Sequence, residues 1–274
     1  MLNKIKRVNE MFFSPTGTTK NVVNLISKEI SDYYNIVGVK TIDFTLPDVR
    51  NDAVSFNSED LMIIGVPVYA GRVPNVLLKY LSLLKGNGAL AVAVVLYGNR
   101  NYDDALIELN DILCEVGFVV VAAGSFVGEH SFSKVLAKDR PDIYDLNIAK
   151  DFAQNICSKI EKADDLKLLS VKGNRPYRNY YKPKDENNNL VDIRKVTPKT
   201  SGNCIDCKLC VKICPMGSID YSNVEQFNGI CIKCGACIKN CPVEAKFYDD
   251  ENYLKHKKEL EEEFTCRREP ELFL

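Results

Sequence analysis

The chain has only two histidines, His130 and His256, among its 274 residues. With so few imidazoles, and no evident nucleophile beside a base, side-chain acid–base catalysis has few agents here. No apolar run approaches the roughly 20 residues that a membrane span requires, and the apolar block in the N-terminal MLNKIKRVNEMFF is too short for a secretory signal. We therefore expect a cytoplasmic protein without a membrane-embedded part.

Residues 1–166 alternate short β-rich runs with amphipathic stretches. Strands are predicted at residues 8–14, 35–43, 61–68, 89–97 and 117–127, and helices after residue 18 and near 74–85, 101–116 and 143–163. The last three strand runs are almost wholly apolar, as in strands buried on both faces of a parallel sheet. The pattern predicts a doubly wound α/β domain whose ligand lies at the carboxyl ends of the strands.

Residues 167–199 form a connector of a different kind, with nine basic and three acidic residues, three prolines and no sustained periodicity. Its tyrosines, Tyr177, Tyr180 and Tyr181, are dense for a flexible tether, so we expect part of it to pack on the first domain. A solvated linker is the alternative. The cysteine-rich region spans residues 200–248, and residues 249–274 are predicted to form a charged surface helix and a tail.

Eight of the eleven cysteines fall in two runs of identical spacing. CIDCKLCVKICP at residues 204–215 and CIKCGACIKNCP at 231–242 both follow C-x-x-C-x-x-C-x-x-x-C-P. Zinc commonly takes two separated C-x-x-C pairs, which would leave the third cysteine of each run unused. A 4Fe-4S cubane uses the tight run of three and a fourth cysteine from elsewhere. The spacing therefore favours two iron–sulfur clusters over zinc or disulfides.

In two-cluster ferredoxins the fourth cysteine of each run binds the other cluster. We assign cluster I to Cys204, Cys207, Cys210 and Cys241, and cluster II to Cys231, Cys234, Cys237 and Cys214. Over about residues 200–248 the sequence resembles the bacterial two-cluster 4Fe-4S ferredoxin family, which implies a small α+β domain. Outside the runs, Cys114 and Cys157 are expected to be inert core residues, and Cys266 has no assigned role.

The stretch SPTGTTKN at residues 14–21 lies where the first predicted strand meets the first helix. It matches neither G-x-G-x-x-G nor G-x-x-x-x-G-K-S/T. It offers hydroxyl groups, a glycine for a tight turn and the free amides of a helix N-terminus, which together can surround a phosphate. The residues concerned are Ser14, Thr16, Gly17, Thr18 and Thr19. An ordinary helix cap rich in Ser and Thr is the alternative.

This loop has the form S/T-x-T-G-x-T of the FMN phosphate loop of flavodoxins, and residues 6–163 resemble that family. The resemblance implies a five-stranded parallel sheet in the order 2-1-3-4-5, with FMN held by the loops after strands one, three and four. After the third strand it implies contacts from Pro67, Val68, Tyr69, Ala70 and Gly71, and after the fourth from Gly98, Asn99, Arg100 and Tyr102.

Tyr69 is the leading candidate to stack on the flavin ring. Packing at a strand end is the alternative for the tyrosines of these loops, and solvent exposure is the alternative for Arg72 and Arg100. The segment GEHSF at residues 128–132 follows the fifth strand at the same edge. We expect it either to cover the flavin or to receive the connector, with His130 a polar loop residue rather than an acid or base.

The whole chain is similar to flavodoxin–ferredoxin fusion proteins of the clostridial type. The resemblance implies electron transport in anaerobic metabolism, between FMN, two 4Fe-4S clusters and redox partner proteins such as ferredoxin-dependent oxidoreductases. The alternative is an FMN-dependent oxidoreductase that reduces a quinone, nitro compound or similar small acceptor. Nucleic-acid binding has weak support, because the basic connector accompanies no recognised module. Steering of an acidic partner, or contact with the flavin phosphate, is the favoured use of its charge.

Overall fold

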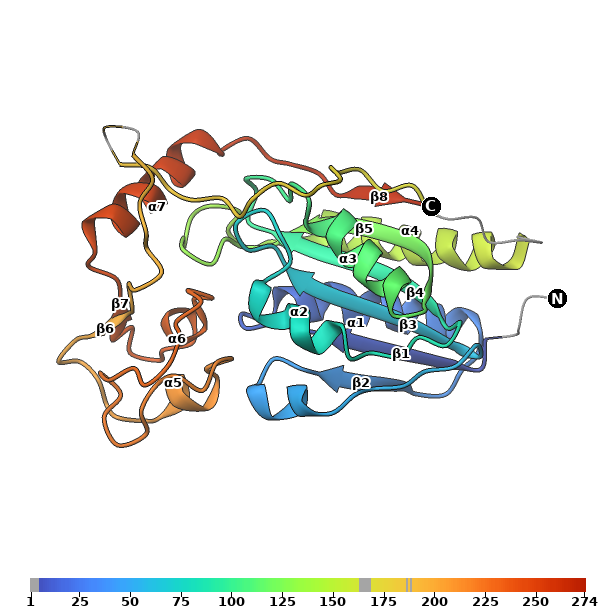
Figure 1. The fold of residues 1–274 in the computed structure, drawn as a ribbon, viewed down its shortest axis with the longest axis horizontal. Helices are drawn as coiled ribbons and strands as arrows, with labels where there is room; N and C mark the ends of the chain where they lie inside the picture. The colour runs from blue at the N-terminus through green and yellow to red at the C-terminus, as the bar shows by residue number, and fades with distance from the viewer. Residues whose placement is uncertain (1–4, 163–168, 186, 188) are drawn as a thin grey trace.

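The computed structural model describes residues 5–162, 169–185, 187 and 189–274. Its centre is a six-stranded sheet in the order β2-β1-β3-β4-β5-β8 (Figure 1). The strands are β1 (Arg7–Phe12), β2 (Val39–Asp43), β3 (Asp60–Pro67), β4 (Leu90–Tyr97), β5 (Val119–Val127) and β8 (Glu271–Phe273). The first five are parallel and confirm the predicted order 2-1-3-4-5. The prediction of five strands was one short, because β8 pairs antiparallel with β5.

Helices cover both faces of this sheet. Apolar residues of α1 (Thr18–Tyr33) and α4 (Ile143–Lys162) form one core, and those of α2 (Asn75–Leu81) and α3 (Ala105–Glu115) form the other. Within β3, Leu61 and Ile63 belong to the first core, whereas Met62 and Ile64 belong to the second. Side chains of a strand point alternately to its two faces, so a strand covered on both sides is apolar throughout.

The cysteine-rich region lies at the carboxyl edge of the sheet, toward which the parallel strands point (Figure 1). It contains two single-turn helices, α5 (Leu209–Lys212) and α6 (Ala236–Lys239), and a two-stranded antiparallel ladder of β6 (Lys199–Thr200) and β7 (Lys246–Phe247). Helix α7 (Glu251–Glu263) follows, and the tail then runs back to β8. The predicted boundary between residues 166 and 167 lies outside the described residues. Nowhere in the described ranges is there a helix with the length and apolarity to span a membrane.

The connector packs on the first domain, as predicted from its tyrosines. The guanidinium of Arg72 lies between two aromatic rings, 4.7 Å from the ring centre of Tyr177 and 5.0 Å from that of Tyr180. Two nitrogens of the same group donate to the carboxylate of Glu108 on α3, at 2.7 and 2.6 Å. Arg72 is therefore not a solvent-exposed charge. It fixes the connector on the loop after β3, because a paired, bidentate guanidinium has little freedom to move.

Candidate cofactor sites

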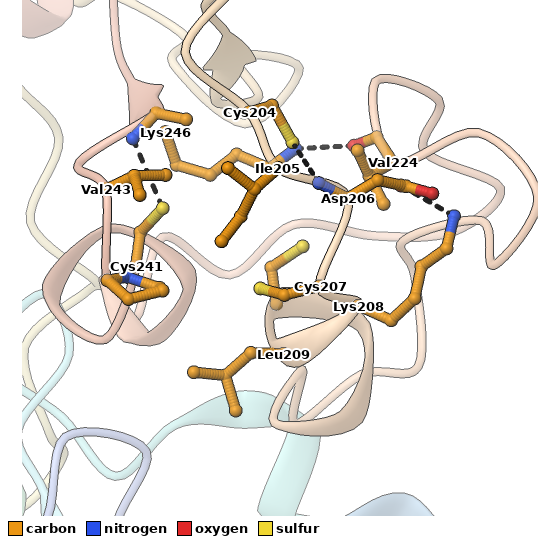
Figure 2. Close-up of a pocket in the computed structure, with 13 residues that line it drawn as sticks. Cys204, Ile205, Asp206, Cys207, Lys208, Leu209, Val224, Cys241, Val243 and Lys246 are labelled. Atoms are coloured by element: carbon orange, nitrogen blue, oxygen red, sulfur yellow. Dashed lines mark hydrogen bonds and ion pairs between the residues drawn. The ribbon is translucent and has the colours of Figure 1, made fainter.

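The described part of the cysteine-rich region contains two cavities, each with about 340 Å³ of empty space. The first is lined by Cys204, Cys207, Cys210 and Cys241, and the second by Cys214, Cys231, Cys234 and Cys237. Figure 2 shows the first, with Cys241 facing the run that begins at Cys204. The fold thus places the fourth cysteine of each run at the cavity of the other run, as the crossed assignment requires.

Each cavity is lined by four cysteines, the number of protein ligands that a 4Fe-4S cluster takes. No group of three or more His, Cys, Asp or Glu side chains in the described ranges is arranged to hold one metal ion. A 4Fe-4S cluster needs no such point of convergence, because its four cysteines bind four different iron atoms. Apolar residues complete the two linings, with Leu209 and Val224 in the first and Ile219 and Phe227 in the second.

The two runs repeat the same backbone geometry at an offset of 27 residues. Three matched pairs of residues have positive φ angles: Asp206 and Lys233 (54° and 57°), Lys208 and Gly235 (60° and 78°), and Gly217 and Glu244 (59° and 50°). Positive φ is uncommon for residues other than glycine and costs free energy. Its recurrence at matched positions indicates that both turns are held in one shape by their surroundings.

Backbone amides donate hydrogen bonds to the ligand sulfurs. The Ser218 N–H lies 3.4 Å from Cys214 Sγ, and the Ala245 N–H, 27 residues later, lies 3.2 Å from Cys241 Sγ. Burial favours the neutral thiol. At Cys241, however, hydrogen bonds from the backbone amides of Val243, Ala245 and Lys246, together with the charge of Lys246, outweigh burial and lower the pKa. At Cys234 burial prevails and raises the pKa to about 12. Cluster binding therefore has to release protons from buried thiols.

The loop between β1 and α1 has the geometry of an anion site. Gly17 is the N-cap of α1 with φ 88° and has no side chain to cap the helix, whose first turn contains no acidic residue. The first amides of a helix have no intrahelical partner and attract negative charge. Ser14 Oγ accepts the Lys20 N–H at 3.0 Å, which fixes the loop, and Thr16 and Thr18 are partly exposed.

Thr19 differs from the other residues predicted for this loop. It is buried, and its methyl group packs on β3, 2.8 Å from where a β-carbon at Gly65 would lie. Its backbone amide remains at the N-terminus of α1, while its side chain belongs to the contact between helix and sheet.

The loop after β3 is a tight turn. Tyr69 and Arg72 exchange two backbone hydrogen bonds of 3.0 and 3.1 Å around Ala70 and Gly71, both of which have positive φ. A β-carbon at Gly71 would collide with the side chain of Asp103, so glycine lets the loops after β3 and β4 meet. Pro67 and Val68 are partly exposed at the strand end. The predicted residues of the two loops are thus brought together.

Tyr69 packs against the same core as Ile232, which lines the second cavity. Burial raises the pKa of its phenol well above the usual value, and the nearby sulfurs of Cys234 and Cys231 add to the shift. Ile232, between these two cysteines in the sequence, packs against the core between the sheet and α2 and α3. The loop after β3 and the second cysteine run therefore share an interface.

Side chains of the loop after β4 bind the C-terminal tail. The Asn99 amide donates to the carbonyls of Phe264 and Cys266, at 2.6 and 2.9 Å, and accepts the Arg268 N–H at 3.1 Å. The Tyr102 hydroxyl donates to Glu271 on β8 at 2.8 Å. These side chains hold the tail in place. The contact with the flavin edge that was predicted for these residues would then be made by the backbone of the loop.

Arg100 and Gly98 are also engaged within the fold. The Arg100 guanidinium pairs with Asp103 and lies 4.9 Å from the ring centre of Tyr181 in the connector, so the charge is not free in solvent. A β-carbon at Gly98 would collide with His130. Sequence reasoning missed Tyr181 and His130 as partners because they lie far along the chain and leave no local signal.

The segment GEHSF receives the cysteine-rich region rather than the connector. Glu129 pairs with Lys239 of α6, and the carbonyl of Ser131 lies only 2.5 Å from where a β-carbon at Gly235 would be. Burial, together with the charge of Lys239, lowers the pKa of His130 to about 3, so this side chain is neutral at physiological pH. Its Nδ1 accepts the Phe132 N–H at 3.1 Å within the same loop.

A second contact joins the two regions on the other side of the sheet. Arg50, in the 3-10 helix η1 (Pro47–Asn51) after β2, donates to the carbonyl of Pro215 and lies 5.8 Å from the ring centre of Phe13. Pro215 lines the second cavity.

Outside the runs, burial raises the pKa of Cys157 to about 12 and that of Cys114 above its usual value, as expected of inert core thiols.

Comparison with known proteins separates the two parts of the chain. Residues 161–258 match the family model of the 4Fe-4S dicluster domain. No curated protein sequence matches the chain. A flavodoxin from the domain Archaea is 18% identical over 57% of this chain and 99% of its own, with a TM-score of 0.40. Flavodoxin 2 from Bacillus cereus is 13% identical over 56% and 99%, with a TM-score of 0.42.

Rubredoxin oxygen:oxidoreductase from Desulfovibrio gigas is 17% identical over 58% of this chain and 37% of its own, with a TM-score of 0.43. The order 2-1-3-4-5 of the parallel strands is itself that of the flavodoxin-like fold. The chain therefore joins a first domain of flavodoxin-like fold to a second that matches the 4Fe-4S dicluster domain.

Proposed function

We propose that the protein is an electron-transfer flavoprotein. FMN, held at the carboxyl edge of the first sheet, would exchange electrons with cluster II, and cluster I would pass them to redox partner proteins. The observation that carries this proposal is the contact of the second cysteine run with the first domain, where Gly235 abuts Ser131 after β5 and Ile232 packs against the core beside the predicted flavin loop. A flavin takes up one or two electrons and each cluster takes one, so the pair can convert between the two kinds of transfer.

The loop from Ser14 to Thr19 supports FMN as the ligand of the first domain. Its hydroxyl groups and uncapped helix amides suit a phosphate, and it follows the first strand of a flavodoxin-like sheet. The loops after β3 and β4 meet at the same edge, where a planar ring has Tyr69 within reach. In open α/β sheets this edge is the usual place of the ligand.

The structure supports an order for the two clusters. Gly235 of the second run abuts Ser131 of the first domain, whereas Lys208, at the matched position of the first run, forms an ion pair with Asp206 of its own run. Cys207 of the first run is exposed to solvent, whereas Cys234 at the matched position is buried. Cluster II is therefore proposed as the cluster next to the flavin, and cluster I as the outer one.

Replacing both Thr16 and Thr18 by alanine is expected to weaken FMN binding by about 100-fold, because each lost hydrogen bond to a charged phosphate costs about 1.5 kcal/mol. The measurement is FMN affinity by fluorescence titration of the purified chain. Iron content should stay at about eight per chain, since the clusters lie in the other domain.

Ser58→Ala is the control, because it removes an exposed hydroxyl just before the amino end of β3, at the opposite edge of the sheet. We expect nearly unchanged FMN affinity in this variant. Unchanged affinity in the Thr16→Ala/Thr18→Ala chain would argue against the phosphate loop.

Turnover assays separate a carrier from an enzyme with a small acceptor. The carrier proposal predicts slow anaerobic turnover with NAD(P)H and quinones or nitroaromatics, and fast exchange with a ferredoxin-reducing partner. The connector supports this expectation because it crosses a predicted flavin loop, where the Tyr181 N–H donates to the Ala70 carbonyl at 2.9 Å. A small acceptor would have to reach the flavin past this segment. Rapid turnover with a small acceptor would instead favour an oxidoreductase.

A further inference from the structure

A buried lysine lines the first cavity. Lys246 on β7 is 3% exposed, and Figure 2 shows it in the lining with Cys241. Its ammonium group donates to Thr200 Oγ1 at 2.7 Å and to the carbonyl of Val224. Both acceptors are neutral, so they satisfy the hydrogen bonds without cancelling the charge. A buried charge acts on its neighbours more strongly than one in solvent.

The second cavity has an apolar residue at the matched position. Ile219 precedes Lys246 by 27 residues, the offset between the two cysteine runs, and it is 4% exposed in the lining of that cavity. The ammonium of Lys246 acts electrostatically on Cys210 and Cys241 of the first cavity. Its field also reaches Cys237 of the second. The repeated fold therefore presents a charge in one lining and a methyl-bearing side chain in the other.

Other cations near the clusters are placed differently. Lys208 is paired with Asp206 at 2.7 Å, which offsets its charge at the first cavity. Lys233 is buried near the second run, and its ammonium also has neutral acceptors, the carbonyls of Arg194 and Cys231 at 3.1 Å each. It is not among the residues that line the second cavity. Of these three lysines, Lys246 is the one that both lines a cluster cavity and has no acidic hydrogen-bond partner.

We propose that Lys246 raises the reduction potential of cluster I above that of cluster II. Reduction adds one negative charge to a cluster, and a nearby fixed positive charge stabilises that form. Exposure of Cys207 to solvent acts in the same direction. This inference rests on the proposed function and deepens it: electrons that arrive through cluster II settle on cluster I, where a partner protein collects them.

The test is an anaerobic redox titration of the full chain, followed by electron paramagnetic resonance. Lys246→Gln keeps a donor for Thr200 and Val224 and removes the charge. We expect the higher of the two cluster potentials to fall by about 59 mV, which is a tenfold change in a one-electron equilibrium. Lys246→Arg, which keeps the charge, should retain the higher potential. Lys212→Met, which removes an exposed charge on α5, should leave both potentials unchanged.

Three results would overturn the proposal. One is an unchanged higher potential in Lys246→Gln with full iron content. Another is an equal fall in Lys246→Gln and Lys246→Arg, which would indicate packing rather than charge. The third is a larger shift in the lower potential. Lys246→Met provides a second neutral side chain if the glutamine variant binds iron poorly. The same titration is repeated in the Thr16→Ala/Thr18→Ala chain, in which FMN binding is weakened. The cluster potentials measured there do not depend on electron transfer from the flavin, so this proposal and the proposed function can fail separately.

Discussion

Serine at both Cys214 and Cys231 is expected to destroy one cluster and spare the other, leaving about four of eight irons per chain. These two cysteines come from different runs, yet both line the second cavity. The four ligands of the other cluster all line the first cavity and keep their cluster. Iron content and the number of paramagnetic centres in the reduced protein measure the outcome.

The matched control changes the same number of cysteines. Cys231→Ser with Cys241→Ser removes one ligand from each cavity, so both clusters should be damaged and iron should fall below the Cys214→Ser/Cys231→Ser level. If each run instead bound its own cluster, the two double variants would exchange results. That exchange would rule out the crossed assignment.

Gly235→Ala is expected to slow electron transfer between the domains, because the rate of electron tunnelling falls exponentially with the separation of the two cofactors. A β-carbon at this position would lie 2.5 Å from the Ser131 carbonyl oxygen, a backbone atom that cannot rotate away. The second run must then retreat from the first domain. Lys208, at the matched position of the first run with φ 60°, shows that this turn tolerates a side chain, so iron content should be retained.

Gly217→Ala is the control for backbone strain. Gly217 also has a positive φ, 59°, but its nearest atom beyond chain neighbours is Pro47 Cγ at 3.6 Å from the added β-carbon, an ordinary contact. Transfer in this variant should match the unmodified chain. Equal slowing in both variants would indicate that strain in the cysteine-rich region, and not the contact with Ser131, governs the rate.

The features predictable from sequence are those with a local signal. The apolar strands in the first 127 residues and the repeated cysteine spacing both depend on near neighbours in the chain, and each placed its residues close to where the structure has them. The pairing of Cys214 with the second run depends on a known rule for two-cluster domains, because neither run alone indicates it.

The features missed depend on distant partners. Asn99 binds the tail at residues 264–268, and β8 has only three residues, too few for a periodic pattern. The position of Arg72 between Tyr177 and Tyr180 joins segments more than 100 residues apart. Contacts of this kind are set by how whole elements pack, so single-sequence patterns do not show them.

The most direct test of the account is whether electrons move between flavin and clusters within one chain. The flavin is reduced selectively by light under anaerobic conditions, and bleaching of the cluster absorption is followed at several protein concentrations. Since the second cysteine run abuts the first domain at Ser131, we expect a first-order rate that does not depend on protein concentration. A rate proportional to protein concentration, or the absence of bleaching with both cofactors bound, would contradict it.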